Sequence, residues 1–438
     1  MQLYSTNNPT LRVSLKEAIF KGLPDDNGLF MPTVIPALPK DFIENLSRYS
    51  FPDISFRVAQ NLIQGAIPDE DLQNIIERAI DFPAPVIRLD DQTFVLELIH
   101  GPSLAFKDFG ARFMAQTMSY FNRKEDRELV ILVATSGDTG GAVAAGFYQT
   151  PGIRVVILYP SGKVSPLQEK QLTTLGHNIS AIEVNGTFDD CQALVKKAFL
   201  DKSITSLIRL SSANSINISR LIPQTFYYFE AFKQVFQSGD EVVFSVPSGN
   251  FGNLTAGLFA KKMGLPISHF LAATNANDVV PKYLDNGEFS PRPSIPTLSN
   301  AMDVGNPSNF ARMLDLYGST WNNMRKDIFG FTFSDAETER AMREIDARFD
   351  GYEIDPHGAI GYLAFQEYRT SAPNAKGVIL ETAHPAKFLE DVERILERKI
   401  NIPKRLSDLS DKEKKATQLG VDFDKFREWL LSRHMEKI

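Results

Sequence analysis

A lysine stands inside an apolar run of the stretch HGPSLAFKDFGARF, residues 100–113. Lys107 lies between Phe106 and Phe109 and directly precedes Asp108. Desolvation disfavours the charged ammonium and lowers its pKa, which gives a neutral amine that can attack a carbonyl carbon. The alternative is a lysine whose stem packs on the two phenylalanines while its head reaches solvent or pairs with Asp108. Taken alone, this stretch favours the second interpretation.

Two glycine-rich stretches carry groups that suit a phosphate or a carboxylate. The first, residues 134–147, reads ATSGDTGGAVAAGF, and its hydroxyls and open amides belong to Ser136, Gly137, Thr139, Gly140 and Gly141. The second, residues 245–257, reads SVPSGNFGNLTAG, and its candidate residues are Ser248, Gly249, Asn250, Phe251, Gly252 and Asn253. Free amides and the dipole at a helix start favour anions. The second stretch lacks both the P-loop lysine and the dinucleotide spacing, so it indicates a small phosphate ester.

A third stretch, ETAHPAKF at residues 381–388, places Thr382 at a strand end and His384 before a proline. A lone histidine in this position is more typical of capping or packing than of catalysis. A lysine in apolar surroundings, a cup for phosphate and a polar partner for a ring nitrogen are what pyridoxal 5'-phosphate requires of a protein. In combination, Lys107 and the two glycine-rich loops, set in an α/β pattern of parallel strands, predict a protein that binds this cofactor.

Short, continuously apolar runs precede these loops. They read ELVILVA, RVVILYP, ISAIEV, EVVFSVP, ISHFLAAT and GVILET, and segments with helical periodicity lie between most of them. This alternation indicates an α/β fold with parallel strands and helices on both faces of the sheet. Ligands of such folds bind outside the carboxyl ends of the strands, which is where the three loops begin.

The first ninety residues are different, with many prolines, polar helix signals and little strand pattern. They predict a mostly helical N-terminal domain over residues 1–90, with the prolines of AIDFPAPVIRL at its boundary.

Composition narrows the class of protein. A hydrophobic fraction of 43% and a charged fraction of 23% are typical of soluble globular proteins, and a net charge of -7 argues against a nucleic-acid partner. Cys191 is the only cysteine and lies in an amphipathic helical pattern, so we expect a core residue and no disulfide. Without a signal peptide or a run long enough to span a bilayer, we expect a cytoplasmic protein with no membrane partner.

Taken in order, the motifs resemble the threonine synthase family of the bacterial and fungal type. This family belongs to the tryptophan-synthase-β-like (fold type II) group of pyridoxal-phosphate enzymes. The matching stretches are NGLFMP, HGPSLAFKDFGARFMAQ, ATSGDTGGA, SPLQEKQLTTLG, SSANSINISRLIPQ, VPSGNFGNLTAGL, SNAMDVGNPSNF and ETAHPAKF. The resemblance implies two open parallel-sheet lobes beside the N-terminal domain. We expect one catalytic region over 91–438, with a large lobe of about 91–120 and 210–438 and a small mobile lobe of about 121–209.

The resemblance also implies roles around the cofactor. Lys107 binds the cofactor aldehyde and later shuttles protons at Cα, Cβ and Cγ of the substrate. The loop from Ser248 to Asn253 holds the cofactor phosphate by its amides, and Thr382 faces the pyridine nitrogen. Asp138 stands where many relatives of this fold carry an asparagine that contacts the ring 3-oxygen. A carboxylate beside a phenolate is unfavourable, so we expect Asp138 to be protonated or turned away.

The substrate groups follow from the same resemblance. The loop from Thr135 to Gly140 would bind the α-carboxylate of O-phospho-L-homoserine. The candidates for its leaving phosphate are Lys163, Ser165, Lys170, Asn217 and Arg220. A guanidinium such as that of Arg220 can bind two phosphate oxygens at once, and Asn217 would share its face on a helix. For Lys163, a solvated surface charge is an equally good interpretation.

The implied reaction eliminates phosphate from Cγ and adds water at Cβ, giving L-threonine and phosphate. Two alternatives stay open. Another lyase of the same fold, such as a serine/threonine dehydratase, needs no second phosphate site. A non-catalytic phosphometabolite-binding protein needs no lysine at position 107. No metal is expected in any of these cases.

Overall fold

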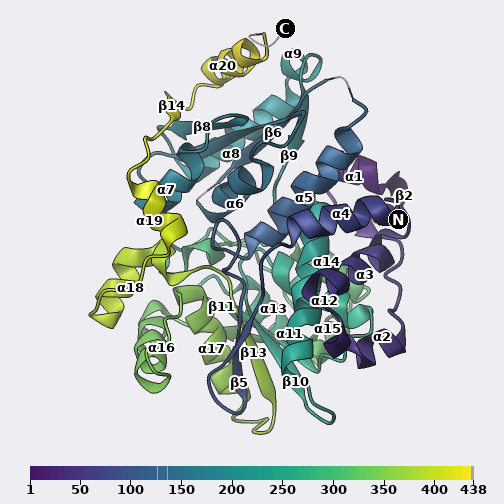
Figure 1. Ribbon diagram of the computed structural model, residues 1–438, viewed down its shortest axis with the longest axis vertical. Helices are drawn as coiled ribbons and strands as arrows, with labels where there is room; N and C mark the ends of the chain where they lie inside the picture. The colour runs from purple at the N-terminus through teal and green to yellow at the C-terminus, as the bar shows by residue number, and fades with distance from the viewer. Residues whose placement is uncertain (126, 136, 436–438) are drawn as a thin grey trace.

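The apolar runs form two separate sheets, one in each lobe of the catalytic region (Figure 1). The computed structural model describes residues 1–125, 127–135 and 137–435. The larger sheet has the order β12-β11-β10-β13-β5-β4, and its pairs are parallel except for β4 and β5. Its strands are β4 (Val86–Arg88), β5 (Thr93–Glu97), β10 (Val242–Pro247), β11 (His269–Thr274), β12 (Ile328–Thr332) and β13 (Lys376–Glu381).

The second sheet is parallel throughout and has the order β14-β8-β7-β6-β9. Its strands are β6 (Leu129–Ala134), β7 (Ile153–Pro160), β8 (Ile179–Val184), β9 (Arg209–Ser212) and β14 (Ala416–Leu419). Every residue of β7 and of β10 is buried, because helices cover both faces of each sheet. The predicted α/β class with two parallel-sheet lobes is confirmed.

Helices connect the strands and cover the sheets. The helices of the lobes are α5 (Lys107–Asn122), α6 (Asp138–Phe147), α7 (Pro166–Thr173), α8 (Phe188–Leu200), α9 (Lys202–Thr205), α10 (Ile218–Leu221), η2 (Ile222–Thr225), α11 (Phe226–Val235), α12 (Gly252–Lys262), α13 (Val279–Asn286), η3 (Asn300–Met302), α14 (Phe310–Leu316), α15 (Trp321–Asp327), α16 (Asp335–Arg348), α17 (Pro356–Tyr368), η4 (Pro385–Phe388), α18 (Leu389–Leu396), α19 (Lys404–Ser410) and α20 (Phe423–Met435). Among the described residues, none of the helices combines the length and the apolar character needed to cross a bilayer.

The N-terminal region is largely helical, as predicted, but it also contains a small antiparallel sheet with the order β2-β1-β3. Its elements are β1 (Gln2–Ser5), β2 (Asn8–Ser14), α1 (Leu15–Lys21), β3 (Phe30–Pro32), α2 (Lys40–Glu44), η1 (Leu46–Arg48), α3 (Phe51–Ile63) and α4 (Asp69–Ala79). The sheet went unpredicted because β1 and β3 are only four and three residues long and β2 lies mostly exposed, so none of them forms an apolar run of normal strand length.

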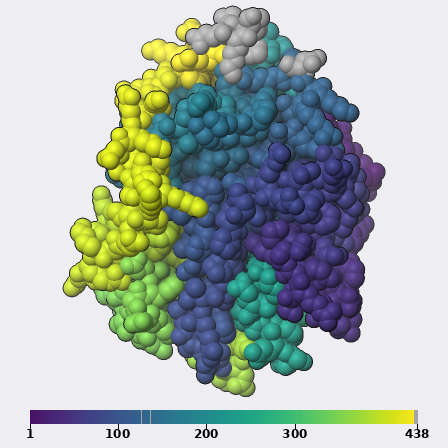
Figure 2. Space-filling model, in the orientation of Figure 1, coloured from purple at the N-terminus to yellow at the C-terminus, as the bar shows by residue number. Residues whose placement is uncertain are grey.

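The C-terminal chain returns to the small lobe. Figure 2 shows it in yellow along one side of the molecule, from the lower lobe to the upper one. There β14 pairs with β8, and Phe426 and Leu430 of α20 pack into the core of the smaller sheet. The expected large lobe of 210–438 is therefore wrong at its C-terminal end. Cys191 lies buried in the same core, as predicted, and burial raises the pKa of its thiol to about 12.

Candidate active site

Lys107 begins α5 at the carboxyl edge of the larger sheet, and a short backbone contact fixes its position. The amide of Phe106 donates to the carbonyl of Thr382 at 2.9 Å, and the amide of His384 donates to the carbonyl of Leu104 at 3.0 Å. Leu104 has a φ of 59°, which is uncommon for a leucine. Such backbone strain persists where neighbouring contacts over-determine the conformation, and here it places Lys107 directly beside the end of β13.

The side chain of Lys107 is 18% exposed, and its Nζ lies 3.9 Å from a carboxylate oxygen of Asp138. Burial lowers the pKa of Lys107; the charges of Lys387 and Arg220 lower it further, and Asp138 opposes them. Asp108 does not pair with this lysine, because its carboxylate accepts from the amide of Ser103 at 2.9 Å. The structure therefore favours a desolvated amine over the snorkelling lysine.

Asp138 is the first residue of α6 and is buried at the centre of this site. Its carboxylate accepts from Lys387 Nζ at 2.7 Å and from Gln168 Nε2 at 2.9 Å. Burial raises the pKa of a carboxyl group, but the charges of Lys387 and Lys107 outweigh it and hold the pKa of Asp138 below its usual range. A second lysine therefore neutralises Asp138, which favours the ionised carboxylate over the protonated one; its position relative to the cofactor ring stays a prediction.

Lys387 was missed by the sequence reasoning. It lies in η4, is fully buried, and donates to the carbonyl of Ser103 at 2.8 Å as well as to Asp138. The signal was the same as for Lys107, a lysine next to a phenylalanine in the apolar stretch HPAKF. The neighbouring His384 only caps η4, where its Nδ1 accepts from the amide of Ala386 at 3.1 Å, and burial lowers its pKa to about 4.

Hydrogen bonds within the loop after β6 fix its conformation. The hydroxyl of Thr135 accepts from the amides of Gly137 and Gly140, at 3.0 and 2.8 Å. Gly137 has a φ of 139°, and a Cβ there would lie 2.8 Å from the side chain of Gln168, so only glycine fits. Thr135 therefore positions the loop, while Thr139 lies half-buried in the first turn of α6. Ser136 lies outside the described residues.

The loop after β10 leads into α12 through Phe251, a left-handed residue with a φ of 59°. The Ser248 hydroxyl donates to Asn253 Oδ1 at 2.7 Å, and Asn250 Nδ2 donates to Ser215 Oγ at 2.7 Å. The polar side chains of this loop are thus used to fix its shape. The backbone amides of 249–253 donate to no acceptor among the described residues, which leaves them available to an anion.

A phosphate group fits this loop. Asn309 Nδ2 is buried without a hydrogen-bond partner in the described part of the chain, and a Cβ on Gly252 would lie 3.4 Å from it. A buried donor without a partner is costly, and a phosphate oxygen above the start of α12 would satisfy it. Thr382, buried at the end of β13, and Lys107 stand at the neighbouring strand end. These residues fit pyridoxal phosphate, with the loop as its phosphate cup.

Of the five candidates for a second phosphate, Arg220 is the one whose charge acts on Lys107 and lowers its pKa. Arg220 lies against α5, where a Cβ on Gly110 would meet its Nε at 2.8 Å. This Nε is buried without a partner among the described residues, and Nη1 donates to the carbonyl of Ala213 at 2.6 Å. Burial lowers the pKa of Arg220 to about 10, so it is still charged at neutral pH.

Of the other four candidates, Ser165 lies next to the site. It caps α7, and its hydroxyl donates to the carbonyl of Lys387 at 3.4 Å. Asn217 caps α10, and its Nδ2 donates to the carbonyl of Ile19 in the N-terminal region at 2.8 Å, so it does not share a helix face with Arg220. Lys170 donates to the carbonyl of Lys412, and Lys163 is exposed.

Comparison with known proteins agrees with this geometry. A family model described as pyridoxal-phosphate dependent enzyme matches residues 81–381, and models of the threonine synthase N terminus and C-terminal part match residues 2–80 and 358–429. The threonine synthase of Haemophilus influenzae is 46% identical over 432 residues, which cover 98% of this chain and 100% of the relative. The chain belongs to the threonine synthase family.

Solved structures of this family share the whole fold. The threonine synthase of Escherichia coli is 44% identical, with a TM-score of 0.90 over 99% of this chain and 100% of the other. The pyridoxal-phosphate-bound threonine synthase of Brucella melitensis is 33% identical, with a TM-score of 0.93 over 99% of both chains. The family is one of pyridoxal-phosphate-dependent enzymes, and pyridoxal phosphate is the cofactor of this chain.

Proposed function

We propose that this protein converts O-phospho-L-homoserine and water to L-threonine and phosphate. The observation that carries the proposal is the desolvated amine of Lys107, set between an anion cup after β10 and a second buried cation, Arg220. The threonine synthases of the comparison, similar over nearly the whole chain, support the same reaction.

The cofactor would be held at three points. Lys107 offers its amine to the aldehyde, the amides of 249–253 with Asn309 receive the phosphate, and the Thr382 hydroxyl faces the ring nitrogen. When bound, pyridoxal phosphate supplies the electron withdrawal that makes protons near the substrate amino group removable. Because a hydroxyl does not keep the ring nitrogen protonated as an aspartate would, the placement of protons falls more heavily on Lys107.

Lys107 is suited to move these protons. Burial lowers its pKa, which makes the neutral amine more available to take up a proton and return it. Asp138 is an acceptor only, because its pKa lies below the usual range. Lys387 supplies the charge that keeps this carboxylate compatible with an anionic ring oxygen next to it.

Arg220 distinguishes the proposed reaction from simple dehydration. Its unpaired Nε and remaining Nη2 can bind oxygens of the leaving phosphate. A dehydratase of the same fold releases no phosphate and has no use for such a group. We therefore assign Arg220 to the substrate phosphate and the loop from Thr135 to Gly140 to the α-carboxylate.

The test measures how much phosphate and how much L-threonine the protein releases. Purified protein given O-phospho-L-homoserine should release phosphate and L-threonine in equal amounts, and Lys107→Ala should abolish both. Lys163→Ala, which changes an exposed lysine outside the cluster, should keep the wild-type rate. Ammonia from L-threonine without phosphate release from O-phosphohomoserine would identify a dehydratase instead. Neither product would indicate a binding protein.

We also propose that the reaction takes place in the cytoplasm. The only cysteine, Cys191, is buried and forms no disulfide within the chain, as suits a reducing compartment. Fractionation of the native cells should recover the activity with the cytosol, and recovery with membranes would contradict this assignment.

A further inference from the structure

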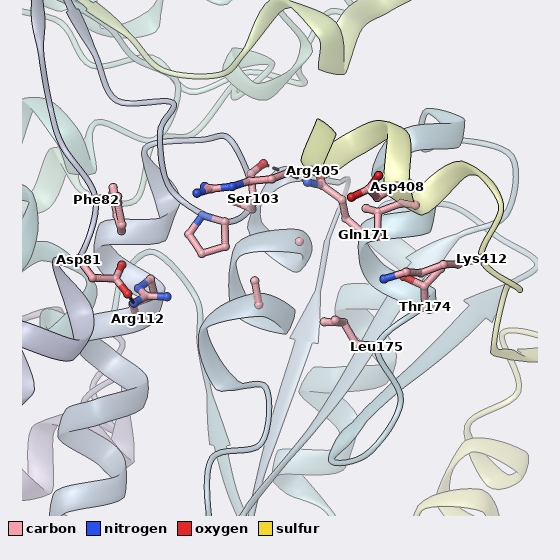
Figure 3. Close-up of a pocket in the computed structure, with 14 residues that line it drawn as sticks. Asp81, Phe82, Ser103, Arg112, Gln171, Thr174, Leu175, Arg405, Asp408 and Lys412 are labelled. Carbon is pink, nitrogen blue, oxygen red and sulfur yellow. Dashed lines mark hydrogen bonds and ion pairs between the residues drawn. The ribbon is translucent and has the colours of Figure 1, made fainter. Parts of the chain in front are cut away.

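A cavity of about 460 Å³ opens at the surface where α5, α6, α7 and α19 meet (Figure 3). Its two carboxylates already pair with cations, Asp81 with Arg112 at 2.6 Å and Asp408 with Lys404 at 2.8 Å. The remaining cations that line it are exposed, so water solvates them. The charges of this cavity are therefore satisfied without a ligand.

Buried arginines are more informative, because a charge taken out of water is costly unless it is paired. Three arginines of the described chain are buried, Arg154, Arg220 and Arg312. Arg154 pairs with Glu128 at 3.3 Å, and Arg220 is assigned above to the substrate phosphate. Arg312 is the buried arginine whose charge the assignments above leave unexplained.

The side chain of Arg312, in α14, is completely buried. Its guanidinium donates to three neutral acceptors, the carbonyl of Phe30 at 3.0 Å, the carbonyl of Ile216 at 2.6 Å and Asn309 Oδ1 at 2.7 Å. None of the carboxylates that the structure describes pairs with it. Burial lowers the pKa of Arg312 to about 9, which leaves it charged at neutral pH. The described chain therefore holds a buried positive charge that none of its own anions balances.

The hydrogen bond to Asn309 directs this charge toward the phosphate cup. Because Arg312 Nη1 donates to Oδ1, the orientation of the amide is fixed and its Nδ2 faces away from the guanidinium. This Nδ2 is the buried donor without a partner in the described chain, near the start of α12 at Gly252. A cation on the oxygen of an amide polarises it and strengthens its N–H groups as donors. Asn309 thus connects the guanidinium to the phosphate cup.

The same guanidinium also holds two other parts of the molecule. Phe30 belongs to β3, which pairs with β1 in the N-terminal sheet. Ile216 directly precedes Asn217, the residue that caps the helix carrying Arg220. Arg312 therefore joins the N-terminal region and the segment that leads to Arg220 at one point beside the phosphate cup.

We propose that Arg312 is a positioning residue for the cofactor phosphate, which orients Asn309 and couples cofactor binding to the docking of the N-terminal region. The phosphate balances the charge of the guanidinium through Asn309, and this stabilises the guanidinium in its buried position with its contact to Phe30. Such coupling is reciprocal, so the docked N-terminal region also favours phosphate binding. The inference rests on the phosphate cup after β10 and does not depend on the proposed reaction.

Binding of two aldehydes to the cofactor-free protein separates the positioning of the phosphate from a general loss of structure. Pyridoxal phosphate and 5-deoxypyridoxal offer the same aldehyde to Lys107, but the second lacks the phosphate. In Arg312→Met, equilibrium dialysis should show at least tenfold weaker binding of pyridoxal phosphate and unchanged binding of 5-deoxypyridoxal. Equal weakening of both, or an unchanged affinity for pyridoxal phosphate, would overturn the proposal. The control Arg340→Met changes an exposed arginine of α16 and should bind both as the wild type does.

Hydrogen exchange of the wild-type protein tests the coupling without relying on the folding of any variant. Pyridoxal phosphate added to the cofactor-free protein should slow amide exchange in β1 and β3 about tenfold, and 5-deoxypyridoxal should not. Equal protection by both aldehydes, or protection by neither, would contradict the coupling.

A wrong phosphate cup and a wrong role for Arg312 give different results. If Asn309→Asp keeps its full affinity for pyridoxal phosphate, the cup itself is wrongly assigned. If Asn309→Asp binds the cofactor more weakly and Arg312→Met does not, the role of Arg312 alone is refuted. Neither measurement uses the substrate, so both outcomes are independent of whether the protein makes L-threonine.

Discussion

Variants of the ion pair between Lys387 and Asp138 test whether this pair stabilises the site. The two groups are almost completely buried and lie 2.7 Å apart. At an effective dielectric constant of about 20, charges at this distance attract by about 6 kcal/mol. Much of this attraction offsets desolvation, so the useful quantity is the cost of removing one partner, which for buried pairs is about 3–5 kcal/mol. Lys387→Met and Asp138→Asn should each lower the unfolding free energy by about that amount.

The double variant Asp138→Asn/Lys387→Met removes both charges at once and leaves neither buried alone. It should therefore lose no more stability than either single variant, which corresponds to a coupling energy of about 3–5 kcal/mol. Urea unfolding of the cofactor-free protein at pH 7, followed by circular dichroism, measures the four proteins of the cycle. Additive losses would refute the reasoning, because they would mean that the two side chains do not stabilise each other.

The same variants should move the reactivity of Lys107 in opposite directions. Lys387 lowers the pKa of Lys107 and Asp138 raises it. The pKa of Lys107 should consequently rise in Lys387→Met and fall in Asp138→Asn. Attachment of pyridoxal phosphate to the cofactor-free protein requires the neutral amine, so its pH midpoint, read from absorption, should shift up in the first variant and down in the second. A shift in the same direction in both would contradict the assigned electrostatics.

Three further predictions concern the surroundings of the site. Gly110→Ala should displace Arg220, because the new Cβ would lie 2.8 Å from its Nε. The variant should raise KM for O-phosphohomoserine about tenfold and leave the cofactor absorption unchanged. Loss of the cofactor instead would contradict the assignment of Arg220. Asn309→Asp keeps the acceptor and removes the donor, so equilibrium dialysis should show at least tenfold weaker cofactor binding, and unchanged affinity would exclude Asn309 from the phosphate cup. Burial raises the pKa of Asp108 to about 6, so the folded state binds this proton more tightly than the unfolded state does. The protonated carboxyl group therefore contributes about 3 kcal/mol to the unfolding free energy below pH 4, and this contribution is lost as the pH rises to 6. Asp108→Asn should flatten the unfolding free energy over this range, and an unaltered pH profile would show that Asp108 is not the group responsible.

Much of the fold and of the site followed from a single pattern in the sequence. Continuous apolar runs identified buried parallel strands, and the rule that ligands bind at their carboxyl ends pointed to the loops after β6, β10 and β13. Thr382 was singled out in this way, because it follows the run that forms β13. Lys107 was singled out by a different signal, a lysine within an apolar run.

Contacts between distant segments could not be predicted from these patterns. Asn309 reaches the phosphate cup from the start of α14, and nothing in its own stretch marks it as a buried donor. Asn217 was expected on a helix face with Arg220, but it caps the helix and is used by the N-terminal region. Strand β14 is short and half-exposed, so the return of the C-terminal chain to the small lobe has no local signal. Lys387 lies in an apolar stretch as Lys107 does, but its role becomes clear only from its contact with Asp138, which the sequence does not show.

The most direct test of the account is to find which lysine carries the cofactor. Borohydride reduction of the holoenzyme, followed by proteolysis and mass spectrometry, fixes the pyridoxyl group on the residue that holds it. The account predicts the label on Lys107 alone, with Lys387 unmodified in its salt bridge. A label on Lys387, or a protein that reduction leaves unmodified throughout, would contradict it.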